Sequence, residues 1–472
     1  MHAKLVLPSL DATRGRLRRH VKYSLFPPLG LATLAAYLRG DDDVTLVDEN
    51  VERLDLSDQP DLVAIEVYTT SARRAYQIAD HYRAKGTHVA LGGLHVTAVP
   101  GEAARHADTV FLGPGEDTWP AFLSDFRAGR PGKRYQSTVR SLSGVPPIRR
   151  DLIKRDRYLA ANSLVVSRGC PHSCDFCTNS TFFRGGKSFY AQPVEEALGE
   201  IERLPGRHLY FLDDHLFGNR QFAFELLSAM RGMNRVWQAA GTVRTVFDRE
   251  LLDLAVASGL RTLLVGFETL SEDNLRNQHK RQNVDIDYSE AVRRFRDAGV
   301  FVNATFVFGM DDDDETVFDR TVEWAVNQGV ETATFHILTP YPGTVLHQRL
   351  AAAGRVTSRN WDLYDTRHVV FEPSRMSAER LRAGYHRAYR DFYRATSIVR
   401  SASHKVRWQD RVRHAIYASA WGKSDLWWNA VVRSGRIGWF TPLLTAVLDG
   451  AGAVHAANSV GQGSAPQIEV RT

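Results

Sequence analysis

Cysteine is scarce in this chain, with three among 472 residues. A small secreted domain held by disulfides needs several cysteine pairs, so this count argues against a disulfide framework and favours a reducing compartment. All three cysteines, Cys170, Cys174 and Cys177, fall within eight consecutive residues. Such clustering in a cysteine-poor chain indicates one site that uses all three thiols.

Long apolar runs are also missing. No stretch approaches the ~18–20 apolar residues that a membrane-spanning helix needs, and no apolar signal segment follows Met1–Lys4. We therefore expect a soluble protein of the cytoplasm. The composition, 43% hydrophobic and 24% charged, is that of an ordinary globular protein, so disorder is not expected over most of its length.

The length predicts more than one domain, because single cores rarely grow beyond ~250–300 residues. The linker that we expect is polar and basic and contains three prolines, and the last residues are rich in Ala, Gly and Ser. These changes of pattern predict a domain at 1–130, a linker at 131–160, a second domain at 161–345, a helical region at 346–449 and a disordered tail at 450–472.

The first domain alternates short apolar runs with helical periodicity, as at 71–86. This alternation predicts an α/β fold with a doubly wound, Rossmann-like parallel sheet. Ligands of such sheets bind beyond the carboxyl ends of the strands. The expected strands are residues 4–8, 44–47, 62–67, 88–91 and 109–112.

The second domain repeats the β-α alternation. Six strands are too few for a closed eight-stranded barrel and predict a partial (β/α)6 barrel, followed by a C-terminal helical extension. In β/α barrels the chemistry lies at the carboxyl ends of the strands. The expected strands are residues 163–167, 208–212, 237–242, 262–266, 301–308 and 332–338.

The three cysteines follow the first strand of this second series at CxxxCxxC spacing. A loop of this length can wrap three thiolates around one 4Fe–4S cluster and leave the fourth iron without a protein ligand. A structural zinc is one alternative, with His172 as a fourth ligand inside a tight loop. Reactive or incidental thiols are another.

The segment 166–177 and the later strand ends resemble the radical S-adenosylmethionine (SAM) superfamily over roughly residues 160–345. The resemblance implies that a 4Fe–4S cluster binds SAM at its open iron, with Phe176 beside the adenine. It further implies that Asp213 and Asp214 hold the SAM amino group and that Glu268 binds the ribose hydroxyls. Taken alone, an Asp pair after a strand is more often a turn and a helix cap than a ligand site.

The strand ends within residues 3–127 resemble the cobalamin-binding domain that precedes many radical SAM domains. Small residues there would let the backbone approach a flat macrocycle and its nucleotide tail. A plain nucleotide-binding domain is the alternative. The resemblance implies cobalamin contacts from Thr69, Thr70, Gly92, Gly93, Gly113, Gly115 and Glu116.

One motif of the cobalamin proteins is absent. Members that replace the lower base with histidine carry DxHxxG after the first strand, whereas residues 10–17 contain no histidine. His95 follows the fourth strand, and we expect it to be a loop contact. The sequence therefore does not identify the ligand on the lower face of the cobalt.

Because one cluster uses all three cysteines, none remains for an auxiliary cluster or for carrying a methyl group. The resemblance then implies a cobalamin-dependent C-methyltransferase, in which a deoxyadenosyl radical activates an unactivated carbon and methylcobalamin supplies the methyl group. The alternatives are a cyclisation, ring contraction or rearrangement without methyl transfer, and a non-catalytic cobalamin or zinc sensor. Bacterial secondary or lipid metabolism fits the resemblance.

The expected partners are a small-molecule or lipid substrate and an electron donor such as flavodoxin or ferredoxin, and no nucleic acid is expected. Residues 400–436 hold eight Lys and Arg against two acids, interspersed with tryptophans such as Trp408 and Trp421. This basic-aromatic region fits either a helical tail that packs its tryptophans on the main body or a peripheral membrane contact.

Overall fold

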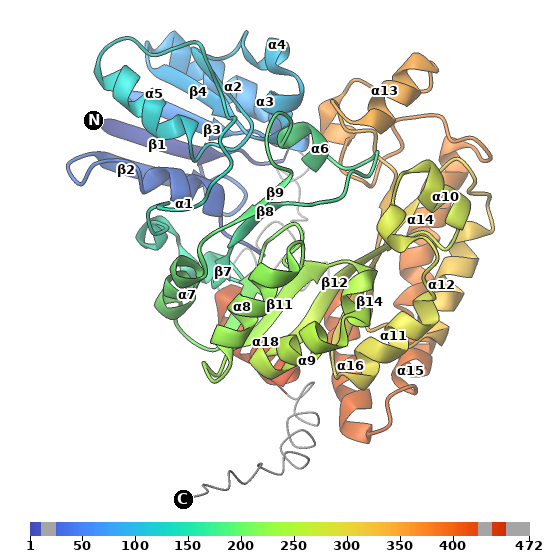
Figure 1. The fold of residues 1–472 in the computed structure, drawn as a ribbon. Coiled ribbons are helices and arrows are strands. Elements are labelled where there is room, and N and C mark those ends of the chain that lie inside the picture. Colours follow the sequence, from blue (N-terminus) through green and yellow to red (C-terminus); the bar gives the residue numbers. More distant parts are fainter. Residues whose placement is uncertain (11–24, 423–436, 450–472) are drawn as a thin grey trace, which may run out of the picture.

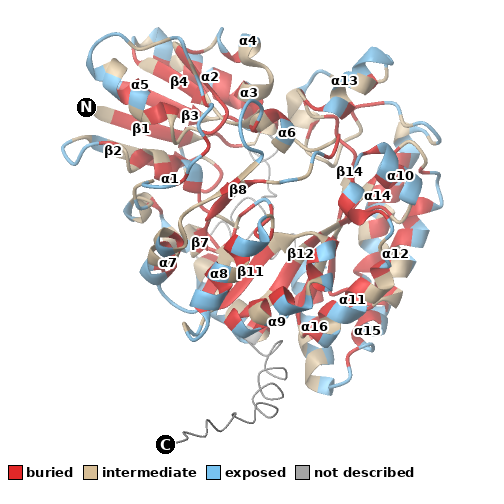
Figure 2. Cartoon of the chain, in the orientation of Figure 1, coloured by how far each residue is buried: buried red, intermediate tan, exposed pale blue. Residues whose placement is uncertain are grey.

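The computed structural model describes residues 1–10, 25–422 and 437–449. Two parallel six-stranded sheets follow one another along the chain, and a group of helices packs beside the second sheet (Figure 1). The strands are largely buried, and the outer faces of the helices are exposed (Figure 2). The expected tail at 450–472 and residues 11–24 lie outside the described residues.

The first sheet has the strand order β2-β1-β3-β4-β5-β6, and every neighbouring pair is parallel. The expected doubly wound α/β sheet is confirmed, because helices cover both faces. Leu29 and Trp119 pack into the core on one face, and Ala75 and Ile78 into the core on the other. The strands are β1 (His2–Leu7), β2 (Asp43–Asp48), β3 (Leu62–Glu66), β4 (His88–Gly92), β5 (Thr109–Leu112) and β6 (Arg134–Gln136).

The helices of this domain are amphipathic and short. The longest, α2, buries Ala75, Ile78 and Tyr82, whose three- and four-residue spacing places them on one side. The sixth strand, β6, lies in the segment that the sequence pattern indicates as a linker, so the sheet extends further along the chain than expected. The helical segments are α1 (Leu29–Ala35), η3 (Thr69–Ser71), α2 (Ala72–Ala84), α3 (Leu94–Ala98), α4 (Pro100–Ala103) and α5 (Thr118–Arg127).

The second sheet pairs each strand with the next one in the chain, which is the connectivity of a partial β/α barrel. The crossover helices return on the outside, where their apolar faces join the main core. The strands are β7 (Ser163–Leu164), β10 (His208–Phe211), β11 (Val236–Gly241), β12 (Leu260–Glu268), β13 (Phe301–Phe308) and β14 (Thr332–Ile337).

Helix ends in the barrel are fixed by short-range chemistry. Asp248 begins α9 by accepting a hydrogen bond from the Leu251 amide, and Gly259 ends it with φ +115°. A Cβ at Gly259 would lie 2.0 Å from the Arg235 carbonyl oxygen, so no other residue fits this approach. The outer helices are α7 (Val194–Arg203), α8 (Arg220–Met230), α9 (Arg249–Ser258), α11 (Tyr288–Asp297), α12 (Val317–Asn327) and α13 (Val345–Ala352).

The C-terminal helices cover the open edge of the barrel. Tyr389 of α14 and Tyr393, which directly follows α14, each bond both backbone groups of a β14 residue, Phe335 and Ala333 respectively. This pairing satisfies an edge strand that would otherwise present free hydrogen-bonding groups. None of the described helices is long and apolar enough to cross a bilayer. The segments are η8 (Trp361–Leu363), α14 (Ala378–Phe392), α15 (Ala395–Ala402), α16 (Trp408–Gly422), η9 (Ile437–Phe440) and α18 (Thr441–Asp449).

Candidate active site between the two domains

The cysteine loop begins at a short antiparallel pair, β8 (Ser167–Gly169) and β9 (Phe189–Ala191), and continues into α6 (Asn179–Phe182). The Cys170 amide donates to the Ser188 carbonyl at 2.8 Å. Gly169 has φ +78°, and a Cβ there would lie 2.0 Å from the same carbonyl oxygen. Only glycine therefore lets the chain turn into the loop at this point.

The three thiols are brought to one loop but differ in exposure. Cys174 is buried, whereas Cys170 and Cys177 are half-buried, and all three are free of disulfides. Burial raises the pKa of Cys170, and it raises that of Cys177 to about 12. Thiolates are the species that bind iron, so a bound metal must supply the free energy of deprotonation here. Among the described residues, no three His, Cys, Asp or Glu side chains, the three cysteines included, are grouped closely enough to hold a metal ion.

The two acids that follow β10 have different environments. Asp213 is 2% exposed and accepts hydrogen bonds from the Val166 amide and from the amide and hydroxyl of Ser167. Burial raises the pKa of Asp213 to about 6. The exposed Asp214 accepts one bond, from the Gly169 amide at 3.0 Å, and lines a cavity. Asp213 therefore holds the start of the cysteine loop, and Asp214 keeps acceptor capacity for a cofactor.

Glu268, at the end of β12, lies against a cation that the sequence pattern did not reveal. Lys280 Nζ is 2.6 Å from Glu268 Oε1, both side chains are buried, and Lys280 also lies 5.9 Å from the centre of the Phe176 ring. Burial alone would lower the pKa of Lys280, but Glu268 and the cysteine thiols raise it overall. The backbone of Glu268 has φ +66°, which is unusual for a residue with a side chain. A buried lysine needs an acidic partner, but sequence spacing alone does not identify Glu268 as the partner of Lys280.

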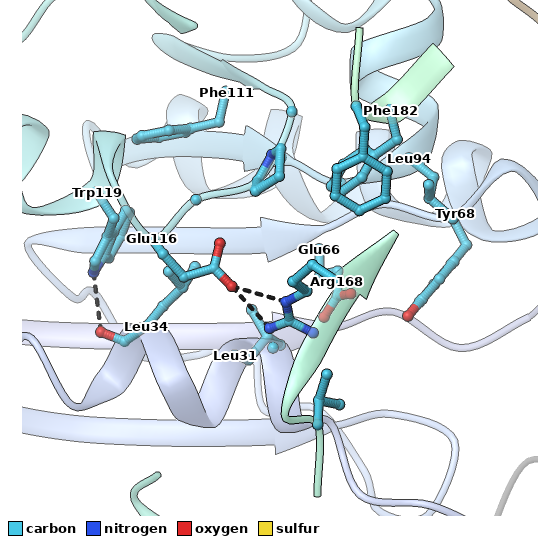
Figure 3. A pocket seen from close by; sticks show the side chains of 18 of the residues that line it. Leu31, Leu34, Glu66, Tyr68, Leu94, Phe111, Glu116, Trp119, Arg168 and Phe182 are labelled. Atoms are coloured by element: carbon cyan, nitrogen blue, oxygen red, sulfur yellow. Dashed lines mark hydrogen bonds and ion pairs between the residues drawn. The ribbon is translucent and has the colours of Figure 1, made fainter. Parts of the chain in front are cut away.

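The strand ends of the first sheet open into two cavities. One, of about 280 Å³, lies between the sheet and the cysteine loop (Figure 3). The other, of about 410 Å³, extends from the ends of β1, β2 and β3 to Thr178 and Tyr341 of the barrel. Of the residues for which cobalamin contacts are predicted, Gly92, Gly93, Gly113, Gly115 and Glu116 line the first cavity, and Thr69 and Thr70 line the second.

The first cavity combines an apolar lining with glycines at the strand ends. Phe111 and Trp119 form part of its apolar lining (Figure 3). Gly93 has φ +106°, and a Cβ there would lie 3.0 Å from the backbone of Val67. Glycine therefore leaves no side chain at the point where a macrocycle would approach the backbone. Glu66 also faces this space, and burial raises its pKa.

No histidine lines either cavity among the described residues. His95 is fully buried, its Nε2 lies 3.3 Å from Glu102, and its ring meets Trp361 edge-on at 5.3 Å. The ring therefore packs between the first domain and the segment that follows the barrel. Residues 11–17, where DxHxxG would be sought, lie outside the described residues.

An ion pair joins the cavity to the cysteine loop. Arg168, two residues before Cys170, donates from Nε and Nη2 to Glu116 Oε1 at 3.1 and 2.8 Å (Figure 3). Glu116 belongs to the first domain and Arg168 to the second, and both side chains line the cavity. Sequence reasoning assigned Glu116 to cobalamin but missed Arg168, because the partners are 52 residues apart.

We predict that Arg168→Met weakens cobalamin binding at least tenfold, about 1.4 kcal/mol. Loss of one partner of a buried pair costs about 3–5 kcal/mol, part of which solvent screens here. Adding Glu116→Gln to the same chain should restore part of the affinity, because the unpaired charge is removed. Equilibrium dialysis measures the dissociation constants for cobalamin.

The matched control is Arg149→Met, which breaks an exposed ion pair with Asp151 in the connecting segment. This variant should bind cobalamin like the parent. An Arg168→Met protein with the parent's affinity would show that the ion pair does not support the cavity.

Comparisons with known proteins agree with this arrangement. The B12 binding domain family matches residues 16–123, and the Radical SAM superfamily matches residues 164–340. Bacteriochlorophyllide d C-12(1)-methyltransferase of Chlorobaculum tepidum is 30% identical over 386 residues, which are 79% of this chain and 84% of that relative. The anaerobic magnesium-protoporphyrin IX monomethyl ester cyclase of Cereibacter sphaeroides is 25% identical over 378 residues, or 71% of this chain and 60% of that relative.

A solved structure shares the whole architecture. The radical SAM methyltransferase TsrM from Kitasatospora setae, with cobalamin and a [4Fe-4S] cluster bound, superposes with a TM-score of 0.61 at 16% identity. The match covers 92% of this chain and 99% of that one, so the order of the two domains is the same. Together with the two family matches and the 30% identical methyltransferase, this establishes that the chain belongs to the radical SAM superfamily, among the members with an N-terminal cobalamin-binding domain.

Proposed function

We propose that the protein methylates an unactivated carbon of a small-molecule or lipid substrate. Its cofactors are a 4Fe–4S cluster, SAM and cobalamin. One observation carries the proposal: the cysteine loop and the glycine-lined cavity share a wall, formed by Ser167, Arg168 and Asp214. Two cofactors bound on either side of that wall would be held against one substrate, which is the main contribution a protein makes to cofactor chemistry.

In this proposal each group of residues has one task. Cys170, Cys174 and Cys177 hold the cluster, and Asp213 fixes the backbone from which Cys170 follows. Asp214 accepts from the SAM amino group. When bound, the cluster supplies the electron that cleaves SAM, and the cobalamin supplies the methyl group.

Glu268 and Lys280 form the opposite side of the proposed SAM site. Lys280 occupies one oxygen of Glu268, and the other lies 3.4 Å from Thr305 Oγ1, so it can still accept from a ribose hydroxyl. Phe176 lies against Lys280 and is half-buried, which leaves its ring available to an adenine. The lysine thus fixes the position of the carboxylate.

Cyclisation without methyl transfer is a second candidate, because one relative is the magnesium-protoporphyrin ester cyclase. The higher identity and coverage of the methyltransferase favour methylation. A sensor without catalysis is disfavoured, since both relatives named above are enzymes. The oxygen-sensitive cluster and the free thiols favour the reducing cytoplasm.

We predict that turnover consumes two SAM molecules per product. With SAM labelled in its methyl group, the label should enter the product, and S-adenosylhomocysteine and deoxyadenosine should form in near-equal amounts after subtraction of uncoupled cleavage. Methylation without a cysteine carrier requires one SAM to supply the methyl group and another to supply the radical. The substrates tested should include bacteriochlorophyllide d, because the 30% identical relative is a bacteriochlorophyllide d methyltransferase.

Mass spectrometry of the products distinguishes the two candidates. An unlabelled product that forms alongside deoxyadenosine alone would reject methylation and support cyclisation or rearrangement.

We also propose that α16 contacts a membrane surface. Its side chains His414, Tyr417 and Ala418 are buried, whereas Trp408, Val412 and Ile416 are exposed at four-residue spacing and form an outward apolar ridge. Eight of the twelve exposed large hydrophobic side chains in the described residues fall within residues 399–443. Trp408 is 69% exposed, so packing of the tail tryptophans on the main body does not hold for it.

The ridge is flanked by the exposed Arg407 and Arg411. Apolar side chains beside cations are typical of surfaces that bind anionic bilayers. Trp427 and Trp428 lie outside the described residues.

We predict that Trp408→Ser with Ile416→Ser lowers sedimentation with phosphatidylglycerol vesicles at least fivefold. Removal of the ridge takes away the apolar area that enters the bilayer. Val139→Ser is the control, because Val139 is 62% exposed but lies in the connecting segment. Equal sedimentation of the ridge variant and the parent would contradict the membrane contact.

A further inference from the structure

Three segments around the cysteine loop contain no acidic residue. Residues 178–190, 274–284 and 340–355 together comprise 40 positions, with seven Lys and Arg and no Asp or Glu. The chain as a whole has 54 Asp and Glu in 472 residues, a frequency that would place between four and five in 40 positions. The cations are Arg184, Lys187, Arg276, Lys280, Arg281, Arg349 and Arg355.

All three segments are bonded to the cysteine loop, although they are far apart in sequence. The Cys170 amide donates to the Ser188 carbonyl at 2.8 Å, and the Asp175 amide donates to the Gln278 carbonyl at 3.0 Å. The Leu346 amide donates to the Asp175 carbonyl, also at 3.0 Å. The acid-free segments, which contain α6, part of α10 (Glu272–Asn277) and α13, therefore lie against this loop and form an outer wall beside it.

One of these segments contacts a cysteine directly. Gln282 Nε2 lies 3.4 Å from Cys174 Sγ, and the residue before it, Arg281, is exposed to solvent. On its other side the loop faces the cavity through Arg168. Substrate and cobalamin would occupy that inner side, so the outer wall offers a separate approach to the cluster.

Within the described residues, the cations of this outer wall divide into a paired group and an unpaired group. Arg184, Lys187 and Arg281 are exposed, and none forms an ion pair with an acid in the part of the chain that the structure describes. Other cations of the three segments are engaged, since Lys280 pairs with Glu268 and Arg355 with Asp311. We call the exposed set Arg184, Lys187 and Arg281 the basic wall.

We propose that the basic wall is the docking surface for an acidic one-electron carrier protein. The carrier would be oxidised by one electron and the 4Fe–4S cluster reduced by one electron, with no bond formed or broken in this step. The inference rests on the proposed function, because only an enzyme that cleaves SAM reductively needs this electron. Charge complementarity steers such encounters and acts mainly on the association rate.

The test is anaerobic stopped-flow reduction of the holoenzyme, followed by bleaching of the cluster absorbance. The probes are a reduced acidic flavodoxin and reduced methyl viologen, a small cation. The variant is Lys187→Glu with Arg281→Glu, and the control is Arg249→Glu, whose side chain is 91% exposed on α9. Iron content and SAM affinity are measured on each protein.

The double variant should be reduced by flavodoxin at least tenfold more slowly at low ionic strength, with the difference shrinking in added salt. Reduction by methyl viologen should stay within twofold or become faster, and the control should match the parent with both reductants. A flavodoxin rate within twofold of the parent would overturn the proposal. An equal slowing with both reductants would also overturn it, because the wall would then set the cluster potential instead of binding a carrier.

These outcomes separate the inference from the proposed function. A cluster that accepts electrons from methyl viologen while SAM stays intact would contradict reductive SAM cleavage itself. Normal SAM cleavage with a flavodoxin rate that charge reversal leaves unchanged would contradict the docking surface alone.

Discussion

Asp213 fixes the start of the cysteine loop by accepting hydrogen bonds from the amides of Val166 and Ser167. Asp214 accepts from Gly169, and the neighbouring segments bond the Cys170 and Asp175 backbone. The loop has little secondary structure of its own, so these contacts decide where the thiols lie. Both proposed cofactor sites depend on these hydrogen bonds. Strand β8 leads into the cysteine loop, and Arg168 of β8 also lines the cavity of the first domain.

Local sequence signals predicted much of this arrangement. Apolar runs separated by amphipathic helices gave both parallel sheets, because a buried parallel strand and its crossover helix have distinct periodicities. The position of the cysteines after β7 followed from the same alternation. Strand β6 was missed because Arg134–Gln136 has no apolar run and its edge position buries little.

Contacts between distant segments could not be predicted in this way. Nothing in the sequence distinguishes Asp213 from Asp214. Only the fold shows that Asp213 is buried against Val166 and Ser167, whereas Asp214 is exposed and lines the cavity. Lys280 and Glu268 meet because a helix and a loop return the chain to the end of β12. Arg168 and Glu116 meet across the domain boundary, which strand and helix patterns do not describe.

The two proposed surfaces lie at different ends of the barrel. Tyr417 of α16 packs with Val236 and Phe301, which begin β11 and β13. The basic wall belongs to segments that bond the cysteine loop, near the carboxyl ends of the strands. A membrane contact through α16 would therefore leave the proposed carrier surface accessible. The same arrangement keeps the approach of electrons apart from the cavities proposed for cobalamin and substrate.

The central claim is that three cysteines hold one 4Fe–4S cluster with an iron open to SAM. Anaerobic reconstitution followed by electron paramagnetic resonance of the reduced protein, with and without SAM, tests it most directly. We predict about four irons per chain, a reduced-cluster signal that changes when SAM is added, and loss of both in the triple variant C170A/C174A/C177A. A triple variant that retains its iron and its signal, or a parent signal that SAM leaves unchanged, would contradict the account.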